Sequence, residues 1–185
     1  MTTRSLEDLK PVLQDPSSQG PSPIYTVEPA NQDEWINKTV IQPGKLGKEY
    51  TKTFGHYHTI KSEPELYRVE SGEGILILQK KHIEEGEWRP EKVDEVLLVQ
   101  AKAGDQILIT PEYGHSWSNV VPSPLVLLDN WSHEHSNEDY AFIAKHKGMS
   151  YYLVEEDGKP TPVKNTNYEA PQPIWATPEQ LPQGV

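Results

Sequence analysis

The chain has 185 residues and a formal net charge of −11 at pH 7. This length predicts one domain with a real hydrophobic core. The negative charge argues against nucleic acid as the partner, because binding to the phosphate backbone requires a basic surface. The absence of cysteine excludes disulfides, thiolate metal sites and a cysteine nucleophile. Any metal ion must therefore be held by histidine and carboxylate side chains.

No apolar run approaches the roughly 20 residues needed to span a bilayer. The first residues lead into charged positions rather than into the apolar core of a secretion signal. We therefore expect a soluble, cytoplasmic protein without a membrane partner. The 17 prolines and 12 glycines indicate many short elements joined by turns.

The first predicted element is a short helix. Ser5 resembles a helix N-cap followed by acids in the first turn, and Leu6, Leu9 and Leu13 then share one helical face. Pro16 ends the pattern, and a loop rich in proline, serine and glycine follows.

From residue 39 onward the pattern is that of an all-β chain, with short strands between glycine and proline turns, as in a sandwich or barrel. Hairpin turns are predicted at Gly104 and Gly158. The charged segment 80–95 is expected to extend a hairpin into solvent. In the proline-rich arm that starts at residue 165, Ile174 and Trp175 are expected to dock against the body or a partner subunit. The predicted strands cover 24–27, 39–41, 50–58, 65–69, 74–79, 96–100, 106–110, 125–128, 151–154 and 161–163.

A candidate metal site lies in the first half of the chain. His56 and His58 are two residues apart, so on a strand both imidazoles leave the same face. Glu65 opens the next predicted strand, which as a hairpin partner presents a carboxylate to the same point. Two nitrogens and an oxygen are a donor set typical of first-row metals with coordination positions open for substrate. His115 is the candidate fourth ligand. An isolated His-x-His pair is weak evidence, since strand histidines are usually packed or solvated.

The segment around His56 and His58 is rich in lysine. Glu49 is the only acid among residues 38–61, a segment that contains five lysines. A local basic cluster in an acidic protein suits a small anionic ligand. The alternative is a solvated, lysine-rich edge strand. The lysines are Lys38, Lys45, Lys48, Lys52 and Lys61.

The two halves of the candidate site resemble the paired motifs of the cupin superfamily, whose fold is a small double-sheet jelly-roll barrel. The first motif there is His-x-His, a spaced glutamate and a following glycine, matched here by His56, His58, Glu65 and Gly72. The second is glycine, proline, histidine and asparagine, matched around His115. The matching residues of the second motif are Gly104, Pro111, His115 and Asn119.

Two departures from the general cupin pattern stand out. The gap from His58 to Glu65 is longer than usual, and Tyr50 occupies a position where glycine is expected. Glu63 fits the shorter gap better and shares the strand parity of Glu65. Only Glu65 keeps the spacing to the following glycine, and Pro64 makes residue 63 a poor ladder position. We therefore choose Glu65 as the ligand.

The departures are themselves features of one family. Four segments closely resemble the cupin-type phosphoglucose isomerases, metal-dependent enzymes known mainly from archaea and some bacteria. The resemblance begins near Arg4-Ser5-Leu6-x-Asp8, is dense from 39 to 79, returns at 111–119 and thins after Trp131. The segments are Pro43-Gly44-Lys45-x-Gly47-Lys48-Glu49, Thr53-x-Gly55-His56-Tyr57-His58, Pro64-Glu65-Leu66-Tyr67 and Gly72-x-Gly74.

This resemblance implies an all-β fold, the cupin double-stranded β-helix or jelly-roll barrel, with a short N-terminal helix and an extended C-terminal arm. It implies a single cupin domain over 1–185. The expected parts are an N-terminal extension at about 1–38, a barrel core at about 39–154, and a C-terminal hairpin and arm at about 155–185. By the same resemblance, a homodimer is expected.

The implied activity is the interconversion of glucose 6-phosphate and fructose 6-phosphate. One divalent metal ion per subunit, Fe²⁺ in the first place and Mn²⁺, Ni²⁺ or Zn²⁺ as alternatives, would be held by His56, His58, Glu65 and His115. As a Lewis acid it would stabilise an enediolate. Glu65 is the candidate base for proton abstraction next to a carbonyl, and a metal-assisted hydride shift is the competing route. Tyr67 would hydrogen-bond a substrate oxygen, or else simply line the core.

The phosphate-binding positions of the family fall on Thr39, Thr53 and the backbone around Gly55, and Lys45 would add a positive field. Trp131 stands where the family's phosphate-contacting tyrosine is expected, and it donates only through its indole nitrogen.

The segment after Trp131 aligns less cleanly with the family. Tyr140 is a further candidate contact to the phosphate. His133 and His135 are equally well explained as surface residues. His82 and His146 are interpreted as surface residues.

Two other functions fit parts of this pattern. A different metal-dependent cupin enzyme would act on another sugar phosphate, as isomerase or epimerase, or as a dioxygenase. A dioxygenase would need an apolar pocket and would have no use for Thr39 and Thr53. A non-catalytic sugar-binding cupin would usually carry an effector domain, for which the remaining residues are too few and too rich in proline. The sequence leaves open the metal and any action on mannose 6-phosphate.

Overall fold

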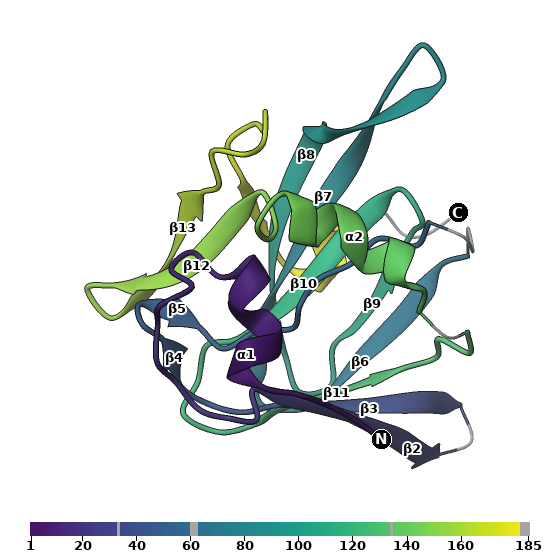
Figure 1. Cartoon of the computed structure of the whole chain (residues 1–185). Helices are drawn as coiled ribbons and strands as arrows, with labels where there is room; N and C mark the ends of the chain where they lie inside the picture. The colour runs from purple at the N-terminus through teal and green to yellow at the C-terminus, as the bar shows by residue number, and fades with distance from the viewer. Residues whose placement is uncertain (33, 60–62, 134, 182–185) are drawn as a thin grey trace.

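The computed structural model describes residues 1–32, 34–59, 63–133 and 135–181 (Figure 1). The described chain is mostly β-structure arranged in three sheets. The strands are β1 (Thr2–Arg4), β2 (Tyr25–Gln32), β3 (Trp35–Ile41), β4 (Lys45–Leu46), β5 (Glu49–Tyr50), β6 (Glu65–Ser71), β7 (Glu73–Glu84), β8 (Glu87–Lys102), β9 (Gln106–Ile109), β10 (Tyr113–Asn119), β11 (Leu125–Asp129), β12 (Tyr151–Glu156), β13 (Lys159–Lys164) and β14 (Ile174–Ala176). The helices are α1 (Leu6–Leu9), α2 (Asn137–Lys145) and the 3₁₀ turns η1 (Lys10–Val12) and η2 (Pro178–Gln180).

The six-stranded sheet has the order β1-β2-β3-β11-β6-β9, and a four-stranded sheet has the order β10-β7-β8-β14. A second four-stranded sheet has the order β13-β12-β5-β4. Apolar side chains of all three sheets form one buried cluster, because strands that alternate inward and outward residues place one face against the other sheet. The described residues therefore form the predicted all-β fold, with strands of three sheets packed around one core.

The N-terminal helix has the predicted cap. The side chain of Ser5 accepts a hydrogen bond from the backbone nitrogen of Asp8, and the Asp8 carboxylate accepts one from the backbone nitrogen of Ser5. This reciprocal arrangement satisfies two amide groups that a helix start otherwise leaves free. Leu9 is buried on this helix, but the helix is shorter than predicted, because Leu13, although buried, is extended and follows the 3₁₀ turn η1.

The hairpin predictions have different outcomes. β12 and β13 pair around Asp157 and Gly158, both with positive φ, as predicted. The charged segment 80–95 does extend the β7–β8 hairpin, which projects from the body (Figure 1). The turn at Gly104 is present, but the predicted hairpin there is wrong. β8 and β9 lie in different sheets, because β9 pairs with β6 and the chain crosses between sheets at this turn.

Two further elements join the barrel. The C-terminal arm docks on the body, since β14 pairs in parallel with β8 and aligns Ile174 with Leu97. Helix α2 was not predicted, although Ser136 and Asp139 form a capping box at its start. That S-x-x-D spacing was the available signal. No helix in the described ranges is long and apolar enough to cross a membrane.

The burial of strand β7 residues in the core predicts how substitutions there affect stability. Leu76 is 0% exposed, whereas Ile83 on the same strand is 57% exposed. Leu76→Ala leaves a cavity among packed side chains, so we expect it to lower the free energy of unfolding by about 2–5 kcal/mol. Ile83→Ala is the matched control and should change it by less than about 0.5 kcal/mol. Urea titrations followed by circular dichroism measure both. Equal losses in the two variants would contradict this description of the core.

Candidate metal centre

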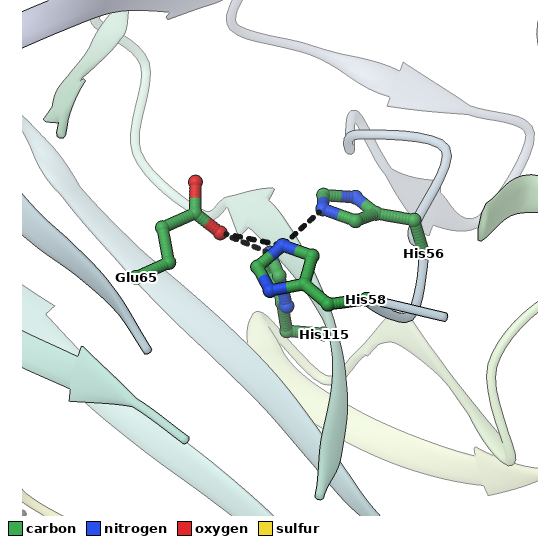
Figure 2. Close-up of side chains that lie close together, drawn as sticks. All are labelled: His56, His58, Glu65 and His115. Carbon is green, nitrogen blue, oxygen red and sulfur yellow. Dashed lines mark hydrogen bonds and ion pairs between the residues drawn. The ribbon is translucent and has the colours of Figure 1, made fainter. Parts of the chain in front are cut away.

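Four side chains from three parts of the chain point toward one another (Figure 2). One potential ligand atom from each of His56, His58, Glu65 and His115 lies within 4.8 Å of every other. Oε2 of Glu65 is 3.3 Å from Nε2 of His58 and 3.2 Å from Nε2 of His115. Nε2 of His56 is 3.3 Å from Nε2 of His58. The sequence-based ligand set is therefore assembled by the fold around one point.

The local structure that achieves this differs from the predicted one. His56 and His58 do not lie on a regular strand beside β6. His56 instead forms an isolated bridge with His115, in which each backbone nitrogen donates to the other residue's carbonyl at 3.1 and 2.9 Å. β6, which Glu65 opens, pairs with β11 and β9. Gly55, with φ of +84°, interrupts regular pairing just before His56.

Helix α2 holds the residues around His58 in place. The backbone nitrogen of Tyr57 donates to the carbonyl of Asp139 at 3.1 Å. The backbone nitrogen and hydroxyl of Thr59 donate to the Asp139 carboxylate at 2.9 and 2.6 Å. The Tyr57 side chain faces the core, where Gly114 leaves room for it, because a Cβ there would meet the ring at 2.5 Å. These contacts replace a strand ladder as the support for the ligand segment.

The charges of this cluster suit a cation. Burial, and then neighbouring histidines, lower the pKa of His56 well below its ordinary value, and burial also lowers the pKa of His115. Neutral imidazoles are the form that binds metal. Burial opposes ionisation of Glu65, but the contacts with His115 and His58 outweigh it and lower the pKa of Glu65 to about 2. His56 and His115 are thus neutral nitrogen donors beside one ionised carboxylate.

Some buried atoms of the cluster lack a hydrogen-bond partner within the described chain. They include Oε2 of Glu65 and Nε2 of His115. Such atoms are costly to bury unless something else satisfies them. A divalent ion between them would accept lone pairs from both. Histidine and carboxylate ligands suit Fe, Mn, Ni or Zn, so the residues present fit a first-row metal.

Three of the four candidate ligands, His56, Glu65 and His115, line a cavity of about 480 Å³. Six of the sequence-predicted substrate or catalytic residues also line it: Thr39, Thr53, Gly55, Tyr67, Trp131 and Tyr140. Its size is typical of small-molecule sites. The lining is rich in hydroxyl, amide and imidazole groups, which suits a polar ligand.

Lys45, in contrast, does not reach the cavity. Its ammonium pairs with Glu155 at the edge of the β4–β5 sheet. Lys52 is buried, pairs with Glu49 and donates to the carbonyl of Val12 at 2.6 Å. Lys45 and Lys52 therefore make local ion pairs, and a contribution of Lys45 to phosphate binding through its field stays a prediction. Lys61 lies outside the described residues.

Two histidines interpreted as possible surface residues line the cavity instead. The ring centre of His135 lies 4.1 Å from that of His56, and burial lowers the pKa of His135 to about 4. His133 lies against Trp131, with its Nε2 3.0 Å from the Glu63 carboxylate. The region after Trp131 thus folds over the ligand cluster.

The other two histidines lie away from the cavity. His82 pairs with Asp94 in the projecting hairpin, as expected of a surface residue. His146 is buried, contrary to its interpretation as a surface residue, because its ring packs on Tyr168.

Sequence reasoning missed several lining residues, notably Arg4, Tyr25, Asn37 and Asp129. Asp129 follows directly on the buried run of β11, and an acid at the end of a buried strand was the available signal. Its Oδ1 accepts hydrogen bonds from Nδ2 of Asn37 at 2.7 Å and from the backbone nitrogen of Trp131 at 3.0 Å. Burial, and then the charge of Glu65, raise the pKa of Asp129 to about 7.

Three histidines and a glutamate that meet at one point beside a polar cavity, in an all-β fold, place the chain in a class of proteins whose site could hold a metal ion. Comparison with known proteins narrows the class. The family model for glucose-6-phosphate isomerase (GPI) matches residues 22–170. The chain belongs to the glucose-6-phosphate isomerase family, which is a family of enzymes.

Individual relatives agree with this. A glucose-6-phosphate isomerase of Pyrococcus abyssi is 29% identical over 149 residues, which cover 80% of this chain and 72% of the relative. One from Thermococcus litoralis is 31% identical over 138 residues, or 74% of this chain and 66% of the relative. Among solved structures, the chain is distantly similar to the Drosophila melanogaster CENP-C cupin domain, at 16% identity and a TM-score of 0.38 over 62% of this chain and 74% of that one.

The ligand set can be tested by metal affinity alone. His115→Ala removes one of four donors, so we expect the affinity of chelator-treated protein for Co²⁺ to fall by at least about 100-fold, since even outer contacts of a metal site contribute 10- to 100-fold. His82→Ala, which removes a histidine of the projecting hairpin, should leave the affinity unchanged. Titration followed by visible absorption measures both. Equal affinities in the two variants would remove His115 from the site.

The raised pKa of Asp129 predicts a pH dependence of stability. Between the ordinary value of 3.8 and about 7, the folded protein holds a proton that the unfolded chain has lost, so this group destabilises the fold increasingly as pH rises through that interval. Asp129→Asn removes the effect. In metal-free protein, we expect the free energy of unfolding of the variant, relative to that of the wild type, to rise by about 2–3 kcal/mol between pH 5 and pH 8. Urea unfolding at both pH values tests this, with the exposed turn variant Asp157→Asn as control. Parallel curves for wild type and Asp129→Asn would contradict it.

Proposed function

We propose that this chain interconverts glucose 6-phosphate and fructose 6-phosphate in the cavity described above. The observation that carries the proposal is the convergence of His56, His58, Glu65 and His115 within 4.8 Å, in a chain of the isomerase family. The aldehyde-to-ketone exchange moves one hydrogen between C1 and C2 of the sugar, and negative charge develops on the two oxygens.

A divalent metal ion bound to these four residues supplies Lewis-acid stabilisation of that charge. We place Fe²⁺ first, with Mn²⁺, Ni²⁺ and Zn²⁺ as alternatives, because a three-histidine, one-carboxylate set suits all of them and affinity order alone does not decide occupancy. The role of the protein is to hold the donors in a fixed, water-poor pocket, where preorganised charges act most strongly.

Residues around the cluster can orient the sugar. Burial, and then the charge of Glu65, raise the pKa of Tyr67 well above its ordinary value, so its phenol stays protonated and can donate to a substrate oxygen. The indole nitrogen of Trp131 is buried without a partner among the described residues, and its ring stacks on His58 at 3.8 Å. Its N–H group is a second donor for the substrate. We assign Thr39 and Thr53 to the phosphate.

Glu65 and Tyr67 are proposed as the catalytic residues, with Gly55 and Tyr140 as further phosphate contacts. Two routes for the hydrogen remain. In one, Glu65 removes the proton, although coordination of a metal reduces the basicity of a carboxylate. In the other, a hydride moves directly between C1 and C2 while the hydroxyl proton passes from one oxygen to the other, and no base acts on carbon. Conversion in heavy water separates them, because proton transfer through an exchangeable base introduces deuterium on carbon and a hydride shift introduces none.

The oligomeric state, the domain organisation and the cellular location form part of the same proposal. We propose a homodimer of single-domain cupin chains acting in the cytoplasm on a small sugar phosphate. The polar lining of the cavity favours that substrate over the apolar one that a dioxygenase would need.

A coupled assay tests the activity. Glucose 6-phosphate formed from fructose 6-phosphate is followed on chelator-treated protein and after adding back each metal. We expect activity to vanish with the chelator and to return with at least one metal. Glu65→Ala should reduce it by at least about 100-fold. Glu63→Ala is the matched control, because this neighbouring carboxylate is exposed and pairs with His133, and it should remain active.

Protein with metal demonstrably bound but no turnover of either sugar phosphate would overturn the isomerase assignment. It would leave the metal site intact. Equal activity of Glu65→Ala and Glu63→Ala would remove Glu65 from the machinery.

A further inference from the structure

Arg4 lines the cavity, and no sequence motif assigned it a role. Among the described residues that form the lining, it is the only lysine or arginine. The chain carries a net charge of −11, and the cavity also contains the carboxylates of Glu65 and Asp129. A doubly charged phosphate would enter this environment at a cost unless a cation met it.

The backbone of Arg4 is fixed on both sides. Arg4 aligns with Tyr25 in the β1–β2 ladder, and its carbonyl accepts a hydrogen bond from the backbone nitrogen of Ile24 at 2.8 Å. The next residue, Ser5, is held in the capping box of α1 by a hydrogen bond of 2.7 Å to Asp8. The direction in which the Arg4 side chain leaves the backbone is therefore set by the fold.

The guanidinium group is packed but not neutralised. Its carbon lies 5.5 Å from the ring centre of Tyr140 and 6.0 Å from that of Phe54. Aromatic contacts of this kind hold the plane of an arginine and leave N–H groups at its edge free. The ion pairs found within the described ranges do not include Arg4.

The β-sheet register places this charge at one end of the cavity. Arg4 is aligned with Tyr25, and Tyr25 with Ile41 on β3. Asp129 is aligned with Asn37, four residues earlier on the same strand. Four residues of strand span about 13 Å. Arg4 and Asp129 thus lie at opposite ends, with Thr39 on the strand between them.

Phe54, which Arg4 contacts, sits between Thr53 and Gly55 in sequence, so the cation adjoins the segment already assigned to the phosphate. We propose that Arg4 is the cation that binds the phosphate group of the substrate. It thereby orients the sugar so that its other end faces the metal ligands. The inference rests on the proposed function only in taking a sugar phosphate as the ligand. Arginine suits this role because its planar fork of donors matches phosphate oxygens.

The rival explanation is structural. Arg4 would then only tie β1 to α2 through Tyr140, and its loss would lower stability without affecting the choice of ligand. Binding of two matched ligands separates the explanations. 6-Phosphogluconate and gluconate differ only in the phosphate, and neither can be isomerised, because a carboxylate replaces the aldehyde.

Isothermal titration of the metal-loaded protein with both ligands is the test. We expect Arg4→Met to lower the affinity for 6-phosphogluconate by between about 10-fold and 100-fold, as for a lost hydrogen bond to a charged group. The affinity for gluconate should change by less than about 2-fold. Arg4→Lys, which keeps the charge, should recover part of the loss. Lys159→Met, which removes a charge from the exposed β12–β13 hairpin, should leave both affinities unchanged.

The inference would be overturned if Arg4→Met lowered the affinities for both ligands equally or lowered neither. It would also be overturned if the wild type bound gluconate as tightly as 6-phosphogluconate. Metal content and the thermal unfolding midpoint of each variant confirm that folded protein is compared. Because no step of this test requires turnover, it remains decisive if the isomerase assay fails. Conversely, an active enzyme whose phosphate preference survives Arg4→Met would refute the role of Arg4 alone.

Discussion

The structure depends on a buried group of polar atoms that the protein does not itself satisfy. Oε2 of Glu65 and Nε2 of His115 lie in the barrel without hydrogen-bond partners in the described chain, and the neighbouring imidazoles of His56 and His58 converge on the same point. In a low-dielectric interior, such an arrangement persists only if the surrounding fold holds it rigidly or a cation completes it. A divalent ion would complete it, and the proposed isomerisation requires such an ion.

The rigidity comes from contacts that are distant in sequence. The bridge between His56 and His115 joins the ligand segment to β10, and Asp139 at the start of α2 holds Tyr57 and Thr59 by backbone and side-chain hydrogen bonds. The histidine segment is therefore supported on two sides although it forms no regular strand. The long connection to Glu65 fits this arrangement, since the glutamate reaches the site on a strand that does not pair with the histidines.

The charged side chains near the site are divided between the cavity and the surrounding sheets. Two of the lysines that precede the site form ion pairs away from the cavity: Lys45 pairs with Glu155 at the edge of a sheet, and the buried Lys52 pairs with Glu49. The cavity keeps one arginine near Thr53 and two carboxylates toward its other end. An anionic ligand with a polar tail would thus enter in one orientation.

The sequence by itself determined the features that depend on neighbouring residues or on motif spacing. These include the capped N-terminal helix, the turn at Gly158 and the four ligand candidates that the barrel brings together. Tertiary structure decided the rest. It placed β9 beside β6 rather than β8, and it brought Arg4 and Asp129 into the cavity while leaving Lys45 outside. The reason is physical: local patterns fix turns and the faces of strands, whereas barrel closure selects which distant strands pair, and only that pairing determines which side chains share a cavity.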